Sequence, residues 1–149
     1  FDFFDTDSLL NSLSDLDKEA MTTLFNQRNF SHEESFTCYL RSVIKLAGFD
    51  DYEYDLVKGD VSNTASEYIN ERPGLKISLL YLDLDLEEPT YDVLQAAWER
   101  VSHGGIVVFD EYAFHKWSES KGVDQFFDDK DVIIKSLNFI APSAYIVKK

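Results

Sequence analysis

The sequence predicts an α/β domain with a largely parallel sheet, and two observations support this prediction. Apolar runs that read as strands alternate with amphipathic stretches that read as helices. Two of the apolar runs, residues 75–82 and 106–110, end abruptly at carboxylates. Such an ending is typical of a buried parallel strand whose tip carries a functional group, because open α/β sheets bind ligands outside the carboxyl ends of their strands.

The first half of the chain is expected to contain three helices and one short strand, besides the end of a strand at residues 1–5. The expected helices cover residues 7–28, 31–47 and 63–72, and the expected strand covers residues 54–58. Ser31 and Glu34 have the spacing of a capping box, in which each side chain satisfies a backbone N–H at the helix start. Gly48 is expected to end the same helix.

The second half is expected to alternate strands with helices and to close with a hairpin. The expected strands cover residues 75–82, 106–110, 132–136 and 144–147, and the expected helices cover 89–102 and 120–127. Pro89 suits the first turn of a helix, and Gly104-Gly105 is expected to end that helix and open the next strand. The last two strands are too close for a helical crossover, so we expect them to pair antiparallel. With no repeat or linker, residues 1–149 are expected to form a single domain.

The composition limits the classes of partner. The 149 residues carry a formal charge of −14, and 44% of them are hydrophobic. So acidic a chain is not expected to bind nucleic acid by neutralising phosphates, nor to bind an anionic membrane surface. No apolar run reaches the length of a membrane span. The single cysteine, Cys38, excludes an internal disulfide and suits a reducing compartment, so we expect a cytoplasmic protein.

Two acidic pairs follow the two apolar runs. Asp83 and Asp85 follow the first run, and Asp110 and Glu111 follow the second. The tips of neighbouring parallel strands are adjacent, so these carboxylates should converge, and they would repel one another unless a cation lies between them. Carboxylate and water oxygens are the ligands of Mg²⁺, so the pattern predicts a site for a hard divalent cation. The alternatives are a solvated strand end at the first pair and a helix cap at Glu111.

Asp83-Leu84-Asp85 is also similar to motifs of other enzyme classes. In metal-dependent glycosyltransferases an Asp-x-Asp pair holds the cation on a sugar nucleotide, but that reading leaves Asp110 and Glu111 without a role. Haloacid-dehalogenase phosphatases usually have Thr or Val where Glu87 stands here. A response-regulator receiver domain should have its acidic pair before the phosphoacceptor strand, near the N-terminus, and that match is poor.

A longer pattern runs from residue 77 to residue 127. It comprises an apolar strand ending in Asp-x-Asp, a Pro-Thr helix start, Gly-Gly before an apolar strand, and an acidic pair followed by Tyr. These features stand at residues 82–85, 89–90, 104–105 and 110–112, with further matches at 1–5, 58–60, 64 and 122–126. The pattern resembles the macrocin-type (TylF-like) S-adenosylmethionine-dependent O-methyltransferases. The resemblance implies a Rossmann-like class I methyltransferase sheet, mostly parallel, with an antiparallel C-terminal hairpin.

The resemblance also implies an activity, namely Mg²⁺-assisted methyl transfer from S-adenosylmethionine to a hydroxyl of a small molecule such as a sugar or natural product. Asp83, Asp110 and Glu111 would hold the Mg²⁺, which lowers the pKa of the substrate hydroxyl. Asp85 would then be the catalytic general base that accepts the hydroxyl proton.

Cofactor contacts are implied at Asp2, near the ribose, and at Asp60, near the adenine. The chain departs from the family at Leu86, where the family usually has Tyr, and at Glu111, where it often has Asp. The first strand and the glycine-rich cofactor loop of such a fold should lie upstream of Phe1, so we expect the chain to be an excerpt of a longer protein. The alternative is a non-catalytic methyltransferase-like interaction module that has lost cofactor binding. The oligomeric state stays open, a homo-oligomer included.

Overall fold

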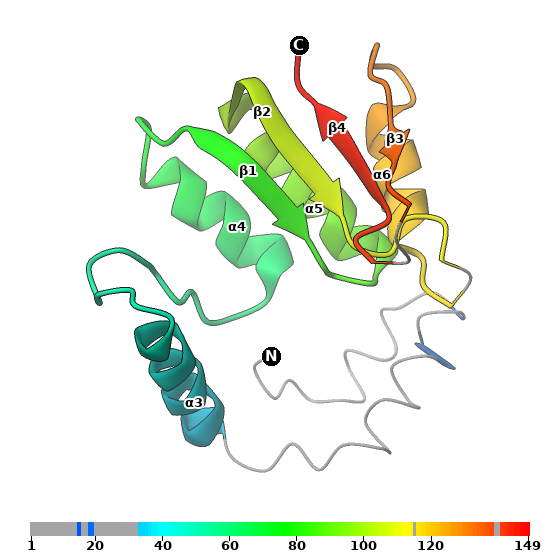
Figure 1. Ribbon diagram of the computed structural model, residues 1–149. Helices are drawn as coiled ribbons and strands as arrows, with labels where there is room; N and C mark the ends of the chain where they lie inside the picture. The colour runs from blue at the N-terminus through cyan, green and yellow to red at the C-terminus, as the bar shows by residue number, and fades with distance from the viewer. Residues whose placement is uncertain (1–14, 16–17, 20–32, 115, 139–140) are drawn as a thin grey trace. The chain divides into compact units, whose positions relative to one another are not determined.

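A computed structural model describes residues 15, 18–19, 33–114, 116–138 and 141–149 (Figure 1). The contacts of the backbone divide the chain into two compact units, Phe1–Asp60 and Val61–Lys149. The helix expected over residues 7–28 lies almost entirely outside the described residues. The expectation of a single domain stays a prediction.

The first unit contains the helix α3, which spans Glu33–Leu46. Gly48 ends it, as predicted, with a left-handed backbone (φ 94°) that glycine adopts without strain. The N–H of Phe49 then donates to the carbonyl of Ile44 at 3.3 Å, which closes the helix end. The strand expected over residues 54–58 is wrong, because this segment forms a loop and pairs with no strand among the described residues.

The second unit is built around one mixed sheet of four strands. In spatial order the strands are β1 (Ile77–Leu82), β2 (Val101–Phe109), β4 (Ala144–Val147) and β3 (Lys135–Ser136). β1 and β2 pair in parallel, whereas β4 pairs antiparallel with both of its neighbours. The α/β class and the C-terminal hairpin are therefore confirmed. The described sheet is mixed, not largely parallel, because β4 returns from the hairpin to lie between β2 and β3.

The connection from β1 to β2 differs from its prediction at both ends. The helix α5 spans Glu87–Ala97 and continues as a 3₁₀ turn, Trp98–Arg100, so β2 begins earlier than expected. Gly104 and Gly105 consequently lie inside β2, where the pairing register with β1 shifts. A Cβ on Gly105 would lie 2.8 Å from the carbonyl oxygen of Ser102, so this irregular stretch requires a glycine.

Three helices accompany the sheet: α4 (Val61–Asn70), α5, and α6 (Glu119–Phe127). Figure 1 shows α5 and α6 against one face of the sheet. Apolar side chains from the strands and from both helices form the buried core there: Leu82, Val93, Leu94, Trp98, Val101, Val107, Phe109, Val123, Phe126, Phe127, Ala144 and Ile146.

The two covering helices approach each other closely at Gly122. A Cβ at that position would lie 2.3 Å from the carbonyl oxygen of Glu87, so only glycine allows α6 to pack here. On the opposite face of the sheet Leu79, Tyr81 and Ile106 are exposed. No helix within the described residues has the length and apolar character to cross a membrane.

Candidate active site

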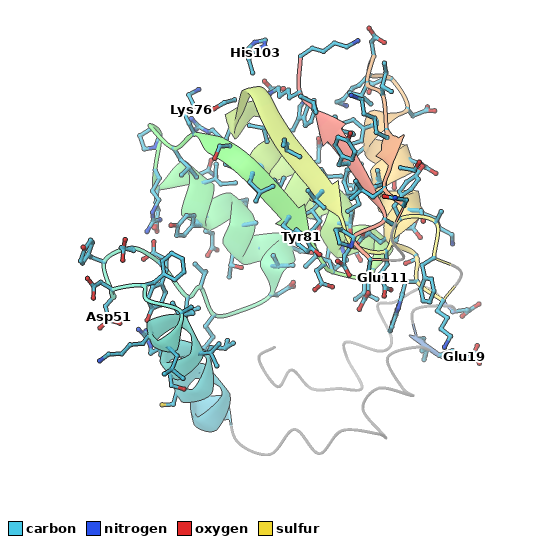
Figure 2. The ribbon with its side chains drawn as sticks, viewed as in Figure 1. Glu19, Asp51, Lys76, Tyr81, His103 and Glu111 are labelled. Carbon is cyan, nitrogen blue, oxygen red and sulfur yellow. The ribbon has the colours of Figure 1, made fainter. Side chains whose placement is uncertain are left out.

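The two acidic pairs come together at the carboxyl ends of β1 and β2. Leu82 is the register partner of Phe109, and the N–H of Asp110 donates to the carbonyl of Leu82 at 2.9 Å. Asp83 and Asp110 therefore follow directly on paired residues. Figure 2 shows Tyr81 and Glu111 at this same end of the sheet. The convergence arises from the parallel pairing, which places the carboxyl ends of both strands at one edge.

The raised pKa values of Asp83 and Glu111 indicate that the carboxyl groups lie close enough to repel one another. Burial raises the pKa of Asp83, and the charge of Asp110 raises it further. Burial likewise raises the pKa of Glu111, although hydrogen bonds to Asp85 and Trp117 act in the opposite direction. Each group is thus harder to ionise than an isolated carboxyl, and a cation between them would relieve the repulsion.

The pKa of Asp85, the predicted general base, is strongly raised. Burial, followed by the charge of Glu111 and a hydrogen bond to its side chain, raises the pKa of Asp85 to about 7. Its backbone is left-handed (φ 63°), and the N–H of Leu86 donates to the carbonyl of Leu84 at 2.7 Å across it. A non-glycine residue in this conformation costs about 1–3 kcal/mol, a kind of strain that clusters at functional sites. A carboxyl group with a pKa near neutrality suits a general base.

Two residues of this site were not singled out from the sequence. Glu119, the first residue of α6, is fully buried, and its Oε2 accepts from the N–H of Leu84 at 3.4 Å. Burial raises the pKa of Glu119 to about 7. Its only sequence signal is an acid at a helix start, which is commonplace.

Tyr81 is the second missed residue. Its hydroxyl donates to Oδ1 of Asp110, and this hydrogen bond is the largest of the effects that raise the pKa of Tyr81 to about 12. The tyrosine therefore stays protonated and donates to one of the predicted metal ligands. In the sequence, Tyr81 is one apolar residue within a strand, and nothing there distinguishes it.

A family model described as Macrocin-O-methyltransferase (TylF) matches residues 31–146. The chain belongs to this family. A search of curated proteins gave no match.

Solved structures agree with membership of the macrocin O-methyltransferase family. The apo structure of CalS11, described as a TDP-rhamnose 3′-O-methyltransferase of calicheamicin biosynthesis, is 32% identical over 83% of this chain and 55% of its own, with a TM-score of 0.69. A second CalS11 structure, a calicheamicin methyltransferase, is 36% identical over 62% of this chain and 36% of its own, with a TM-score of 0.57.

The O-methyltransferase NovP shares the fold. It is 19% identical over 93% of this chain and 53% of its own, with a TM-score of 0.71. The chain thus spans about half the length of the solved structures that it covers best.

The donor atoms of this macrocin-family site are of the type that binds a hard cation. Among the described residues, no group of three or more His, Cys, Asp or Glu side chains is arranged as a ready metal cage. One carboxylate oxygen, Oε2 of Glu111, is nevertheless buried without a hydrogen-bond partner. An orphaned anionic oxygen beside other carboxylates fits the ligand chemistry of Mg²⁺.

Two further residues, Asp2 and Asp60, were predicted to bind S-adenosylmethionine. Asp60 is half-buried and ends the first unit, directly before α4. Asp2 lies outside the described residues. Their roles at the adenine and ribose stay predictions.

Proposed function

We propose that this chain is part of an S-adenosylmethionine-dependent O-methyltransferase that methylates a hydroxyl of a small molecule, a sugar or natural product. The observation that carries the proposal is the convergence of four acidic side chains on paired strand ends in a macrocin-family chain. The description of CalS11 as a TDP-rhamnose 3′-O-methyltransferase supports a sugar hydroxyl as the acceptor class.

The proposal assigns each acidic residue a role. Asp83, Asp110 and Glu111 hold a divalent cation, Mg²⁺, which when bound lowers the pKa of the acceptor hydroxyl. Asp85 is the general base, and Asp2 and Asp60 contact S-adenosylmethionine. A cytoplasmic location remains a prediction, and the oligomeric state stays open.

The reaction requires side chains that orient the acceptor hydroxyl and accept its proton. S-adenosylmethionine supplies an electrophilic methyl group on its sulfonium. Asp85 orients the acceptor hydroxyl and takes its proton as the oxygen bonds to the methyl carbon and the carbon–sulfur bond breaks. The neighbouring charge of Glu111 is one cause of the raised pKa of Asp85, which suits a carboxylate that accepts a proton. Methylation thus leaves one proton on Asp85, to be released to solvent.

The experiment compares Asp83→Ala and Asp110→Ala with Asp128→Ala in the full-length protein, using TDP-rhamnose as the first acceptor and a panel of sugar nucleotides after it. The two site variants should lower the rate of methyl transfer at least about 100-fold, because several kcal/mol of charge stabilisation is lost. They should also weaken Mg²⁺ binding. Asp128 is an exposed acid just beyond α6, so its variant controls for the loss of charge.

Full activity in both site variants, or in the wild type under metal chelation, would refute the mechanism. Calorimetry with S-adenosylmethionine and S-adenosylhomocysteine tests the broader proposal. Saturable binding supports the enzyme, whereas absence of binding supports the non-catalytic module.

A further inference from the structure

Glu119 reaches from the start of α6 into the space between the two loops that carry the acidic pairs. Its side chain is completely buried. Oε2 accepts from the N–H of Leu84, and the backbone N–H groups of Glu111 and Asp85 also favour the ionised form. Oε1 is buried without a hydrogen-bond partner. The carboxyl group therefore lies against the backbone of both loops.

The same helix start holds the turn at Asp85 through its backbone. The N–H groups of Ser118 and Glu119 donate to the carbonyl of Asp85 at 3.0 and 3.1 Å. In return, the hydroxyl of Ser118 accepts from the N–H of Glu87 at 2.8 Å, which caps α5. Hydrogen bonds thus join the start of α6 to the loop that carries Asp85, and each segment supplies both donors and acceptors.

Stability alone does not explain why a buried acid stands at position 119. Asp85 holds a left-handed backbone that a non-glycine residue rarely adopts, so its surroundings must impose it. A buried acid beside Asp85 and Asp110 adds negative charge where charge is already unfavourable. An apolar residue at position 119 would avoid that repulsion but would leave the N–H of Leu84 without its acceptor.

We propose that Glu119 is a positioning residue: its buried carboxylate holds the backbone at Leu84, and thereby keeps Asp85 in the left-handed turn that faces Glu111. This inference rests on the proposed function, in which Asp85 is the base and Glu111 a cation ligand. In this proposal Glu119 acts through the backbone at Leu84 and not on the reacting atoms.

The test compares three variants of the full-length protein. Glu119→Met keeps the volume and shape of the side chain but removes its acceptors, and Glu119→Gln restores one acceptor oxygen. Val123→Ala is the matched control, because Val123 is equally buried on the same helix but lies in the apolar core. The first readout is the intraresidue amide–Hα NOE of Asp85, which is strong when φ is positive. The second is the affinity for Mn²⁺, used as a paramagnetic probe of the cation site.

We expect Glu119→Met to weaken the NOE and to lower Mn²⁺ affinity about 10- to 100-fold, the usual effect of losing a residue that orients metal ligands. Glu119→Gln should retain the NOE, and Val123→Ala should change neither readout. If Glu119→Met does not fold, Glu119→Asp, which withdraws the carboxylate by one methylene, replaces it with the same expectation.

An unchanged NOE in the folded Met or Asp variant overturns the positioning role, as does the same loss in Val123→Ala. A wild-type protein that binds no Mn²⁺ overturns the proposed cation site instead. The NOE comparison then still decides whether Glu119 holds the turn, so the two failures are distinguishable.

Discussion

Phe109 and Asp110 are neighbours in the chain, yet they belong to regions of opposite character. Phe109 is completely buried, and its ring contacts those of Tyr112 and Phe127 in the core. Asp110 begins the acidic end of the same strand, where it raises the pKa of Asp83 and accepts from Tyr81. At the end of β2, two consecutive residues therefore belong to different regions. Phe109 lies in a region that stabilises the folded state, and Asp110 lies in one that destabilises it.

The difference shows what each region is optimised for. In the core every buried group lowers the free energy of the folded state, because apolar surface leaves water. At the acidic end a strained turn, repelling carboxylates and an orphaned oxygen all raise it. Proteins retain such features mainly where a site requires them, so the cost supports the proposal of a functional site at the acidic end.

Removing the central ring of the core should have the largest effect on stability. Phe109→Ala is expected to lower the free energy of unfolding by about 3–5 kcal/mol, from lost burial and the cavity left behind. Urea denaturation followed by circular dichroism measures this change. Ile133→Ala is the control, because Ile133 is 58% exposed and its truncation should cost little. A similar loss in both variants would mean that the core does not centre on Phe109.

The contact between the helices should be the next most sensitive place. Gly122→Ala is expected to cost about 1–3 kcal/mol, since the new methyl group collides with the backbone at Glu87 and forces α5 and α6 apart. Gly74→Ala provides the matched control, because a Cβ at Gly74 meets nothing within 4 Å. Equal denaturation midpoints for the two variants would contradict the close packing at Gly122.

These regions also differ in how far the sequence predicts them. The apolar runs predicted β1, β2 and their adjacent carboxyl ends, because periodicity and a carboxylate after an apolar run are local signals. Glu119, Tyr81 and the left-handed turn at Asp85 depend on contacts between residues far apart in the chain. Local patterns do not encode such contacts, so the surroundings of the site required the structure.

The glycine pair shows the same limit within the fold. Gly104-Gly105 resembles a helix end, but it lies inside β2, where its small size allows an irregular pairing with β1. Likewise, residues 54–58 have the composition of a strand and form none among the described residues, because a strand also needs a partner. In both places tertiary packing overrode the local preference.

The acidic end should respond to substitution in the direction opposite to the core. Asp85→Asn removes an unfavourable charge, and Asn tolerates a left-handed backbone. In the metal-free protein at pH 8 we expect a gain in the free energy of unfolding of less than about 1 kcal/mol, because solvent screens part of the repulsion. Methyl transfer should fall in the same variant, so urea denaturation and the activity assay should move in opposite directions. Destabilisation by Asp85→Asn would contradict the account of a strained, repulsive site.

The raised pKa values at the acidic end also predict a dependence of stability on pH in the metal-free protein. Asp85 and Glu119 have pKa values raised to about 7, above the value of about 4 of an unfolded carboxyl. Between these values the folded state binds more protons than the unfolded state, so the free energy of unfolding falls as pH rises from about 4 to 7.

Urea midpoints at about pH 5 and 8 should show this fall in the free energy of unfolding, and the double variant Asp85→Asn/Glu119→Gln should reduce it. Saturating Mg²⁺ should reduce it as well, because a cation that binds only the folded state compensates the carboxylates as they ionise. If the free energy of unfolding of the double variant changed with pH as much as that of the wild type, other groups would cause the dependence. The carboxyl groups of the acidic end would then not destabilise the folded state.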